Sequence, residues 1–418
     1  MANAAPTSKK RGSRGLLLGI VFLALAMQIF LTAPNSASLE STFELTSRRG
    51  GIAIEAPTVV LPTTITMQIL ASVIAVIGVR QLFQGNKNIT FSILIVVGIT
   101  LAAFLVWATR DKSLNFTGML VSSLVRATPI ALAALSGLYS ERSGVVNIGI
   151  EGMMLTGAFT SVIFASVYDN MLVGVVAGIL GGLLLGAIHA ILSIRYKVNQ
   201  IVSGAGLIIL ALGLTSYLQR AILNVNTELN DPGPAIAAVP IPGLWKIPVI
   251  GPVFFNQSPI GYILFLLIGL TYVLMNFTPW GLRIRSVGEH PKAADTLGIN
   301  VYKIRYVSVL ISGAIAGLAG SYMSIGSVGR FNEGMTAGKG FLGLAAMIFG
   351  NWNPGGAFIG SLIFGFFDSW QEKLSILQVG IPVDLLGMAP YLATMIVLSG
   401  VVRRSRMPAA DGKPYEKE

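Results

Sequence analysis

The chain has 418 residues, of which 53% are hydrophobic and only 11% are charged. Soluble domains usually carry about 25% charged residues, so this composition excludes an ordinary soluble protein and indicates one membrane domain. The net charge is +11, but the basic residues lie in loops between apolar blocks, which argues against a nucleic-acid partner. Cysteine is absent, which excludes disulfides, thiolate metal sites and a cysteine nucleophile.

Apolar blocks recur along nearly the whole chain. A spanning helix needs about 20 mostly apolar residues. The blocks that meet this length are 15–32, 58–79, 89–108, 117–138, 151–168, 171–194, 201–219, 259–278, 304–326 and 385–402. The sequence therefore predicts an all-α fold, a polytopic bundle of transmembrane helices with about 10–12 spans.

The first block has two interpretations. Its basic flank contains Lys9, Lys10, Arg11 and Arg14, and a small-residue stretch follows near Ala37, as in a cleaved signal peptide. Its apolar run is about 17 residues long, whereas signal peptides usually have about 7–15. We therefore expect an uncleaved anchor rather than removal of residues 1–37.

Three segments outside the spans are polar or irregular. Residues 33–57 are mixed and polar, and residues 220–258 carry six prolines, which predicts a stiff, irregular cap rather than a helix. The tail after Arg406 is short and polar, so we expect it to be disordered.

Glycines interrupt a helical run at 144–152 and place Asn147 and Glu151 beside apolar residues. Polar groups at such depth are costly unless they are partnered or wet, so we interpret 144–152 as a broken helix that lines a path. The alternative is a simple turn at the membrane face. We expect that alternative to hold for Glu141 and Arg142, as solvated residues.

Glycines also recur every four residues at 174–186, which predicts close helix packing without a role in substrate binding. His189 lies alone on this apolar helix, and no third ligand is spaced for zinc, so we expect a hydrogen bond between helices. Arg126 and Asp368 are ionisable residues within apolar blocks, with either a functional role or a place near the interface.

The loop 283–300 contains a short helix with clear boundaries. Pro291 stands in its first turn and Gly298 lies just past its end, while Ala293, Ala294 and Leu297 share one face. A helix this short is marginal alone in water and must dock on something. From the residues alone, a coupling helix for a cytoplasmic ATPase and an ordinary connecting turn are equally good interpretations.

The apolar stretch 340–372 is interrupted at Asn351–Gly356, where a proline and paired glycines end a helix. About two thirds of the 29 lysines and arginines fall on one side of the alternating spans, which predicts that both termini are cytoplasmic. An even number of crossings then requires either two crossings or a re-entrant dip at 340–372.

The chain has no Walker phosphate loop, so it is not expected to bind ATP itself.

Several long motifs resemble one family. They are GLYSERSGVVNIGIEGMMLTGAF (137–159), QIVSGAGLIILALGLTSYL (200–218), GLRIRSVGEHPKAADTLGINVYKIRY (281–306), MTAGKGFLGLAAMIFGNWNPGGA (335–357) and FGFFDS (364–369). The chain is similar, over about 115–402, to the inner-membrane permeases of bacterial ATP-binding-cassette (ABC) importers for ribose, branched-chain amino acids and nucleosides. Within that family it is most similar to the smaller of the two paired nucleoside permeases.

The resemblance implies a role for individual residues. ATPase coupling is expected at Glu289, His290, Pro291, Ala293, Ala294, Gly298 and Ile299. For the translocation path we expect polar or soft groups at helix breaks and span ends, namely Asn147, Glu151, Gln200, Met335 and Asn351. No catalytic, cofactor or metal residue is expected.

The resemblance also implies an organisation and partners. Residues 1–110 are expected to form an N-terminal extension with about three spans, 111–402 the permease core and 403–418 a cytoplasmic tail. Partners are an ATPase subunit that binds ATP and Mg²⁺, a second permease in a heterodimer, an extracytoplasmic substrate-binding protein and membrane lipid. The expected location is the bacterial inner membrane, and the expected substrate is a nucleoside. A ribose-type sugar permease, an ion-coupled carrier, and a membrane scaffold or enzyme are the alternatives.

Overall fold

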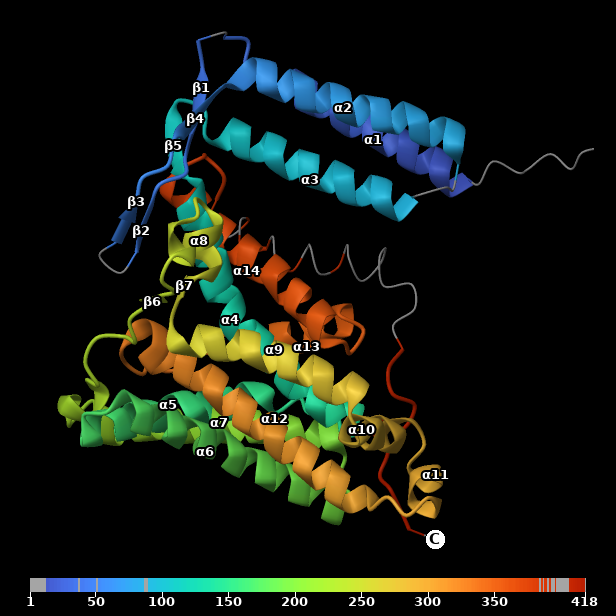
Figure 1. Ribbon diagram of the computed structural model, residues 1–418, viewed down its shortest axis with the longest axis vertical. Coiled ribbons are helices and arrows are strands. Elements are labelled where there is room, and N and C mark those ends of the chain that lie inside the picture. Colours follow the sequence, from blue (N-terminus) through green and yellow to red (C-terminus); the bar gives the residue numbers. More distant parts are fainter. Residues whose placement is uncertain are drawn as a thin grey trace, which may run out of the picture. The chain divides into compact units, whose positions relative to one another are not determined.

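The computed structural model describes residues 13–36, 38–49, 52–85, 89–382 and 406–417, together with the single positions 385, 387, 388, 391 and 395. The chain divides into two units, which we describe separately (Figure 1). The smaller unit contains most of the chain up to residue 117 and the segment 372–382. The larger unit contains 118–371 and 406–417.

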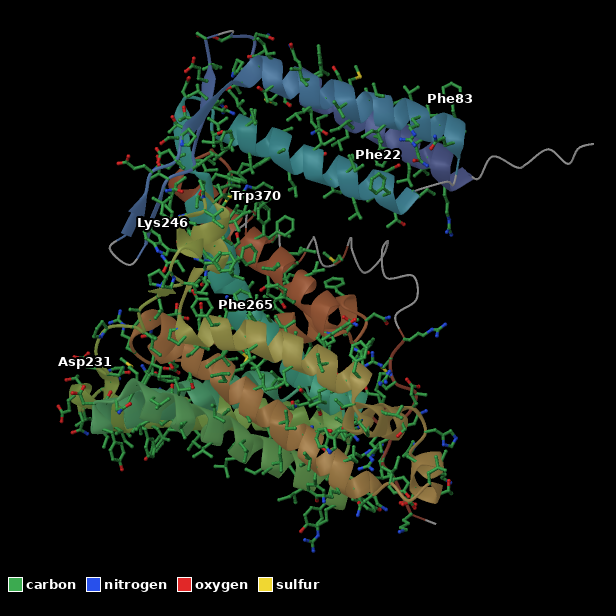
Figure 2. All side chains as sticks on the ribbon, viewed as in Figure 1. Phe22, Phe83, Asp231, Lys246, Phe265 and Trp370 are labelled. Atoms are coloured by element: carbon green, nitrogen blue, oxygen red, sulfur yellow. The ribbon has the colours of Figure 1, made fainter. Side chains whose placement is uncertain are left out.

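Three apolar helices form the smaller unit: α1 (Ser13–Thr32), α2 (Thr63–Gln84) and α3 (Ile89–Ala108). Phe22 and Ile74 are buried between them, whereas Phe83 projects outward from α2 and is 74% exposed (Figure 2). Large apolar side chains on the outer surface are typical of helices that face lipid, which is as apolar as the core.

A small three-stranded sheet joins these helices. Its order is β4 (Thr58–Pro62), β1 (Glu40–Glu44), β5 (Lys112–Asn115), with β1 antiparallel to β4 and parallel to β5. Strands β2 (Ser47–Arg49) and β3 (Ile52–Ile54) form a second, two-stranded sheet. The Ser41 hydroxyl lies 2.7 Å from both the Thr63 hydroxyl and the Val106 carbonyl oxygen, which ties β1 to α2 and α3. The sheet was not predicted, because four- and five-residue strands carry little local signal.

The larger unit consists mainly of helices. In chain order these are α4 (Phe116–Arg142), α5 (Ile150–Tyr168), α6 (Met171–Ala190), α7 (Gln200–Leu218), α8 (Ile250–Phe254), α9 (Pro259–Phe277), α10 (Pro279–Glu289), α11 (Pro291–Thr296), α12 (Val301–Met323), α13 (Lys339–Phe349) and α14 (Pro354–Ile376). The ends of α6, α7 and α12 continue as π-helical turns at Ile191–Arg195, Gln219–Leu223 and Ser324–Val328. Residues 224–258 hold the 3₁₀ turns Thr227–Asn230 and Leu244–Lys246, the short strands β6 (Val239–Pro240) and β7 (Asn256–Gln257), and α8, so the predicted irregular cap contains only short elements.

Glycine packing brings α5, α6 and α12 together. A Cβ atom on Gly182 would lie closer than 3.0 Å to the Gly313 carbonyl oxygen, and one on Gly157 would lie 2.6 Å from the Gly317 Cα atom. Only glycine permits such an approach of one backbone to another. The close packing that the repeated glycines predict is therefore present, and Figure 1 shows these helices side by side.

Nine helices of the described residues are long and apolar enough to cross a membrane, and they correspond to the first nine predicted spans. Some bounds differ: the second predicted span, 58–79, is a helix at Thr63–Gln84, because its first residues form β4. The tenth predicted span, 385–402, lies outside the described residues apart from single positions. The polytopic helical fold is thus confirmed.

The predicted interruption of 340–372 separates α13 from α14. With 11 residues, α13 is about 16 Å long, too short to cross a bilayer. Helix α14 runs antiparallel to α4: Arg142 at one end of α4 contacts Trp352, and Ser369 donates a hydrogen bond to the Met119 carbonyl oxygen at the other. Helix α14 therefore lies alongside α4, and the choice between two crossings and a re-entrant dip at 340–372 stays a prediction.

The prediction of a disordered tail is wrong for residues 406–417, which belong to the larger unit and pack against its helices. Ala410, Asp411 and Tyr415 are buried there. The tail is polar in composition, but its partners lie on helices that sequence patterns cannot assign to it.

Candidate functional site

The chain between α4 and α5 is unwound and buried. Gly144 has a φ of 86°, a conformation that favours glycine. The Val146 amide donates to the Gln200 side-chain oxygen at 2.7 Å, and the Val146 carbonyl lies 2.9 Å from His189 Nε2. Side chains of α6 and α7 thus satisfy backbone groups that a continuous helix would have paired, which an unwound segment in an apolar bundle requires. The predicted break of the helical run is therefore present.

The hydrogen bonds of His189 fix its tautomer. A carbonyl oxygen only accepts, so Nε2 carries the proton and Nδ1 accepts from the Ser203 hydroxyl at 3.1 Å. His189 therefore links α6, α7 and the unwound segment, which agrees with the predicted hydrogen bond between helices.

Asn147 joins this segment to α4 and α12. Its side-chain nitrogen donates to the Ser312 hydroxyl at 3.0 Å, and that hydroxyl lies 2.9 Å from the Ser136 hydroxyl. Asn147 is fully buried. Asn147 therefore holds the unwound segment between α4 and α5 in place.

Glu151, in the first turn of α5, holds the beginning of α13. Its two carboxylate oxygens accept from the backbone N–H groups of Gly338 at 2.8 Å and Gly340 at 2.6 Å. These N–H groups have no partner within a helix, and the positive end of the helix dipole favours a carboxylate at this place. A Cβ on Gly340 would lie 2.7 Å from a carboxylate oxygen of Glu151, so this contact requires glycine.

The other end of α13 is held by α4. The Trp352 indole donates to the Glu141 carboxylate at 2.7 Å, and the Arg142 guanidinium donates to the Trp352 carbonyl oxygen at 2.8 Å. The prediction that Glu141 is solvated is therefore wrong, since Glu141 is only 7% exposed, whereas Arg142 is half-buried. The partner of Glu141 lies 211 residues away in the sequence, so no local pattern could reveal it.

The two ionisable residues singled out from the sequence form an ion pair. Arg126 Nη1 and Lys339 Nζ each lie 3.2 Å from the same carboxylate oxygen of Asp368. All three side chains are partly exposed, so they do not form a dry buried pair. Lys339 was not predicted to lie here, because it is the first residue of α13, and only the fold places that end of α13 beside Asp368.

The predicted short helix is α11, and its ends are well defined. His290 Nδ1 accepts from the Ala293 amide at the beginning. At the other end Gly298 has a φ of 80°, and Ile299 donates to the Ala294 carbonyl oxygen, as in a Schellman motif.

The predicted common face of α11 divides in two. Ala294 is 2% exposed and packs into the bundle, whereas Leu297 is 81% exposed. One side of the helix therefore docks on the membrane helices, and the other presents a large apolar side chain outward.

The residues predicted for a translocation path lie in two places. Asn147, Glu151 and Gln200 are buried around the break between α4 and α5. Met335 is half-buried in the segment before α13, and Asn351 is exposed at the turn after α13. The structure thus brings Glu151 and the segment of Met335 together at one end of α13 and places Asn351 at the other.

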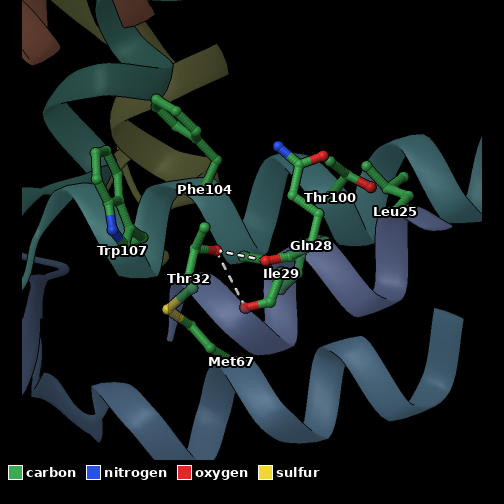
Figure 3. Close-up of a pocket in the computed structure, with 9 residues that line it drawn as sticks. Leu25, Gln28, Ile29, Thr32, Met67, Thr100, Phe104 and Trp107 are labelled. Atoms are coloured by element: carbon green, nitrogen blue, oxygen red, sulfur yellow. Dashed lines mark hydrogen bonds between the residues drawn. The ribbon is translucent and has the colours of Figure 1, made fainter. Parts of the chain in front are cut away.

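A cavity of about 290 Å³ lies within the smaller unit, between α1, α2 and α3 (Figure 3). Its lining includes Ile29, Met67, Phe104 and Trp107. The Thr32 hydroxyl at its edge donates to carbonyl oxygens of its own helix at 2.9 and 3.2 Å. Because the lining is mainly apolar, this cavity suits an acyl chain better than a polar solute.

Apolar helices with interruptions at depth, and buried polar groups that hold these interruptions, define a polytopic membrane protein of the transporter class. Residues 119–399 match the family described as branched-chain amino acid transport system / permease component, and the chain belongs to this permease family. It is therefore a multi-pass protein of the inner membrane.

Individual relatives agree with this assignment. The guanosine ABC transporter permease protein NupQ of Bacillus subtilis is 43% identical over 71% of this chain and 95% of its own. The nucleoside ABC transporter permease protein NupC of Lactococcus lactis is 38% identical over 72% and 96%. The putative glucose ABC transporter permease protein TsgC13 of Haloferax volcanii is 32% identical over 72% and 98%. No solved structure matches the chain.

Proposed function

We propose that this chain is the permease subunit of an ATP-driven importer and that its substrates are nucleosides. The observation that carries the ATP-driven part is α11, which is docked through Ala294 and presents the exposed Leu297. A helix with one buried and one exposed apolar side suits a groove on a separate protein. Two relatives that are named as guanosine and nucleoside permeases support the substrate.

The loop 283–300, which we call the coupling loop, would bind an ATPase subunit that holds ATP and Mg²⁺. In this proposal His290 and Pro291 start α11, Gly298 and Ile299 end it, and Ala294 fixes it to the bundle. Glu289 and Ala293 lie on the exposed side of the loop. Both termini and this loop would then be cytoplasmic.

Two further partners follow from the proposal. A second, distinct permease would pair with this chain to enclose one path, and an extracytoplasmic binding protein would deliver the substrate. Residues 111–402 would form the permease core. The two relatives match over nearly their full length but cover only about 70% of this chain, and the family match spans residues 119–399. This supports residues 1–110 as an added extension and 403–418 as a tail.

The path would run along the breaks at both ends of α13. Asn147, Glu151 and Gln200 would hold the unwound segment, and Met335 and Asn351 would lie in the connections that flank α13. A nucleoside is neutral, so it needs hydrogen bonds and apolar contacts rather than a buried counter-charge. Backbone groups of an interrupted helix can supply such contacts.

The mechanism would be alternating access. ATP binding closes the ATPase dimer, which moves α11, and the bundle changes from inward-open to outward-open. Substrate enters from the binding protein and leaves to the cytoplasm after hydrolysis. The permease needs only weak binding, because the delivery protein supplies the affinity.

Sugar transport is the second candidate, because one relative is named as a putative glucose permease. The test is reconstitution of this chain with a candidate ATPase and partner permease in liposomes. Nucleoside uptake that requires ATP supports the proposal, and uptake of ribose or glucose alone supports the second candidate. Transport by this chain alone, driven by an ion gradient, would show that it is a secondary carrier. The absence of any uptake would favour a membrane scaffold or an enzyme.

A further inference from the structure

The C-terminal segment 406–417 lies across the same face of the larger unit as α10 and α11, where Figure 1 draws it in red. Residues 408, 410, 411 and 415 are buried. A short polar segment gains so much burial only when its partners are specific, because ordering each residue costs about 1–2 kcal/mol of backbone entropy.

One part of the segment contacts the coupling loop. The Ala410 amide donates to the Gly288 carbonyl oxygen at 2.9 Å, and the Ala409 amide to the Glu289 carboxylate at 3.4 Å. Lys417 lies 4.0 Å from Asp295 on α11 itself, a pair too exposed to contribute much. The segment therefore holds the start of the coupling loop through backbone hydrogen bonds.

The beginning of the segment contacts the turn between α13 and α14. The Arg406 amide donates to the Asn351 side-chain oxygen at 2.8 Å. Asn351 precedes Trp352, which Arg142 and Glu141 hold, so this turn is itself fixed to α4. At its other end, α13 is fixed to Glu151 beside the broken helix.

The middle of the segment covers the beginning of α12. Arg305 is 2% exposed and donates to the Lys413 carbonyl oxygen at 3.0 Å, while the carboxyl of Asp411 faces it. The rings of Tyr302 and Tyr415 meet edge to face at 5.3 Å. A buried guanidinium is costly without partners, so the segment is part of the folded unit and not a loose end.

We propose that residues 406–417 form a strap that ties the coupling loop to the α13–α14 turn, and that this tie transmits the movement of α11 to α13. The inference rests on the proposed function. Helix α11 has six residues and cannot act as a rigid lever by itself. The strap supplies a second connection, from Glu289 to Asn351, that the chain order does not provide.

Amide hydrogen exchange of the purified full chain tests the tie independently of transport. Deletion of residues 406–418, which removes the Arg406 amide as well, is expected to increase exchange at both 288–297 and 350–353, at least tenfold, while exchange within α5 and α6 stays unchanged. Unchanged exchange at either of the first two places would overturn the strap.

A second experiment, ATP hydrolysis by the assembled transporter, tests whether the strap transmits movement from α11 to α13. In the truncated variant the ATPase subunit is still expected to co-purify, and basal ATP hydrolysis is expected to remain. Substrate-loaded binding protein, however, should no longer increase the rate of hydrolysis. Full stimulation, or loss of the ATPase subunit, would contradict the proposal, the latter because the segment would then be a docking site. If the unmodified complex does not hydrolyse ATP, the proposed function fails, and the exchange experiment still decides the strap.

A matched pair of substitutions addresses the contact at Asn351, whose φ is 53°. Asn351→Gly keeps this conformation but removes the acceptor, whereas Asn351→Asp keeps both. We expect Asn351→Gly to raise amide exchange of the segment 406–411 about fivefold, the factor of one hydrogen bond, and Asn351→Asp to keep the exchange of the unmodified chain. Equal exchange in the two variants would show that this contact does not hold the strap.

Discussion

The Glu151 carboxylate lies 2.6 Å from the backbone nitrogen of Gly340, although 189 residues separate the two in the sequence. This contact joins the first turn of α5 to the first turn of α13. It therefore connects the unwound segment before α5 to the beginning of α13 and places a negative charge at a helix N-terminus, where the dipole stabilises it.

Substitution of Glu151 should loosen both elements. Glu151→Gln replaces one acceptor oxygen by an NH₂ group that faces an N–H, so we expect a loss of about 1.5–3 kcal/mol in stability and a strong loss of uptake. Thermal unfolding in detergent and uptake in liposomes measure the two effects. Glu333→Gln, at an exposed carboxylate in the segment before α13, is the control and should change neither.

Glycine packing gives a second prediction. In Gly317→Ala the new Cβ would lie closer than 3.0 Å to the Gly178 carbonyl oxygen, a backbone atom that cannot move away freely. We expect a loss of about 1–3 kcal/mol in stability. The matched control is Gly213→Ala on α7, where nothing lies within 4 Å of the new Cβ. It should leave the isolated chain unchanged or stabilise it by about 0.5–1 kcal/mol, and equal effects in both variants would refute the packing account.

The exposed Leu297 gives a prediction about assembly. Leu297→Asp should leave the thermal stability of the isolated chain within about 0.5 kcal/mol, because the side chain packs on little of its own chain. The same substitution should abolish co-purification with the ATPase subunit, whereas Leu297→Met should preserve it. Normal assembly of the aspartate variant would show that α11 is only a connecting turn.

Asp411 makes the docking of the strap depend on pH. Burial raises the pKa of Asp411 from 3.8 to about 7, against the opposing effects of a hydrogen bond from Gly412 and of Arg305. At a pH between these two pKa values, the Asp411 carboxyl is therefore protonated when the strap is docked and ionised when it is released. The free energy of docking therefore becomes less favourable as pH rises from about 4 to about 7, and it stays constant above that range.

The measurement is fluorescence anisotropy of a dye on Lys417→Cys, which is specific because the chain has no other cysteine. Anisotropy should fall as pH rises toward 7 and level off above it. Glu141 of α4 also faces Asp411, so Asp411→Asn is needed to isolate its contribution. The asparagine variant should remain docked across the range, and an unchanged pH profile would assign the effect to another group.

Much of the fold could be predicted, because membrane insertion depends on local properties. Length and apolarity determine a span, and both are read directly from a stretch such as 171–194. The breaks at Gly144 and at Asn351–Gly356 were also readable, since glycine and proline change the backbone wherever they stand.

The contacts of the candidate site could not be predicted in the same way. Glu141, Arg142 and Glu151 bond to residues about 190–210 positions away, and a charge pattern gives no information about such a partner. The tail was misjudged for the same reason. A polar tail is expected to be disordered only if no other part of the chain buries it. Here Arg305 and Tyr302 pack against the tail.

The sequence by itself determined that this protein is a bundle of membrane helices with two interruptions and a short capped helix near residue 291. Each of these features follows from residues close together in the chain. Only the tertiary structure decided what holds the interruptions, which side of α11 is free, and where residues 406–417 lie. The physical reason is that a buried polar group must be paired, and the fold alone chooses its partner.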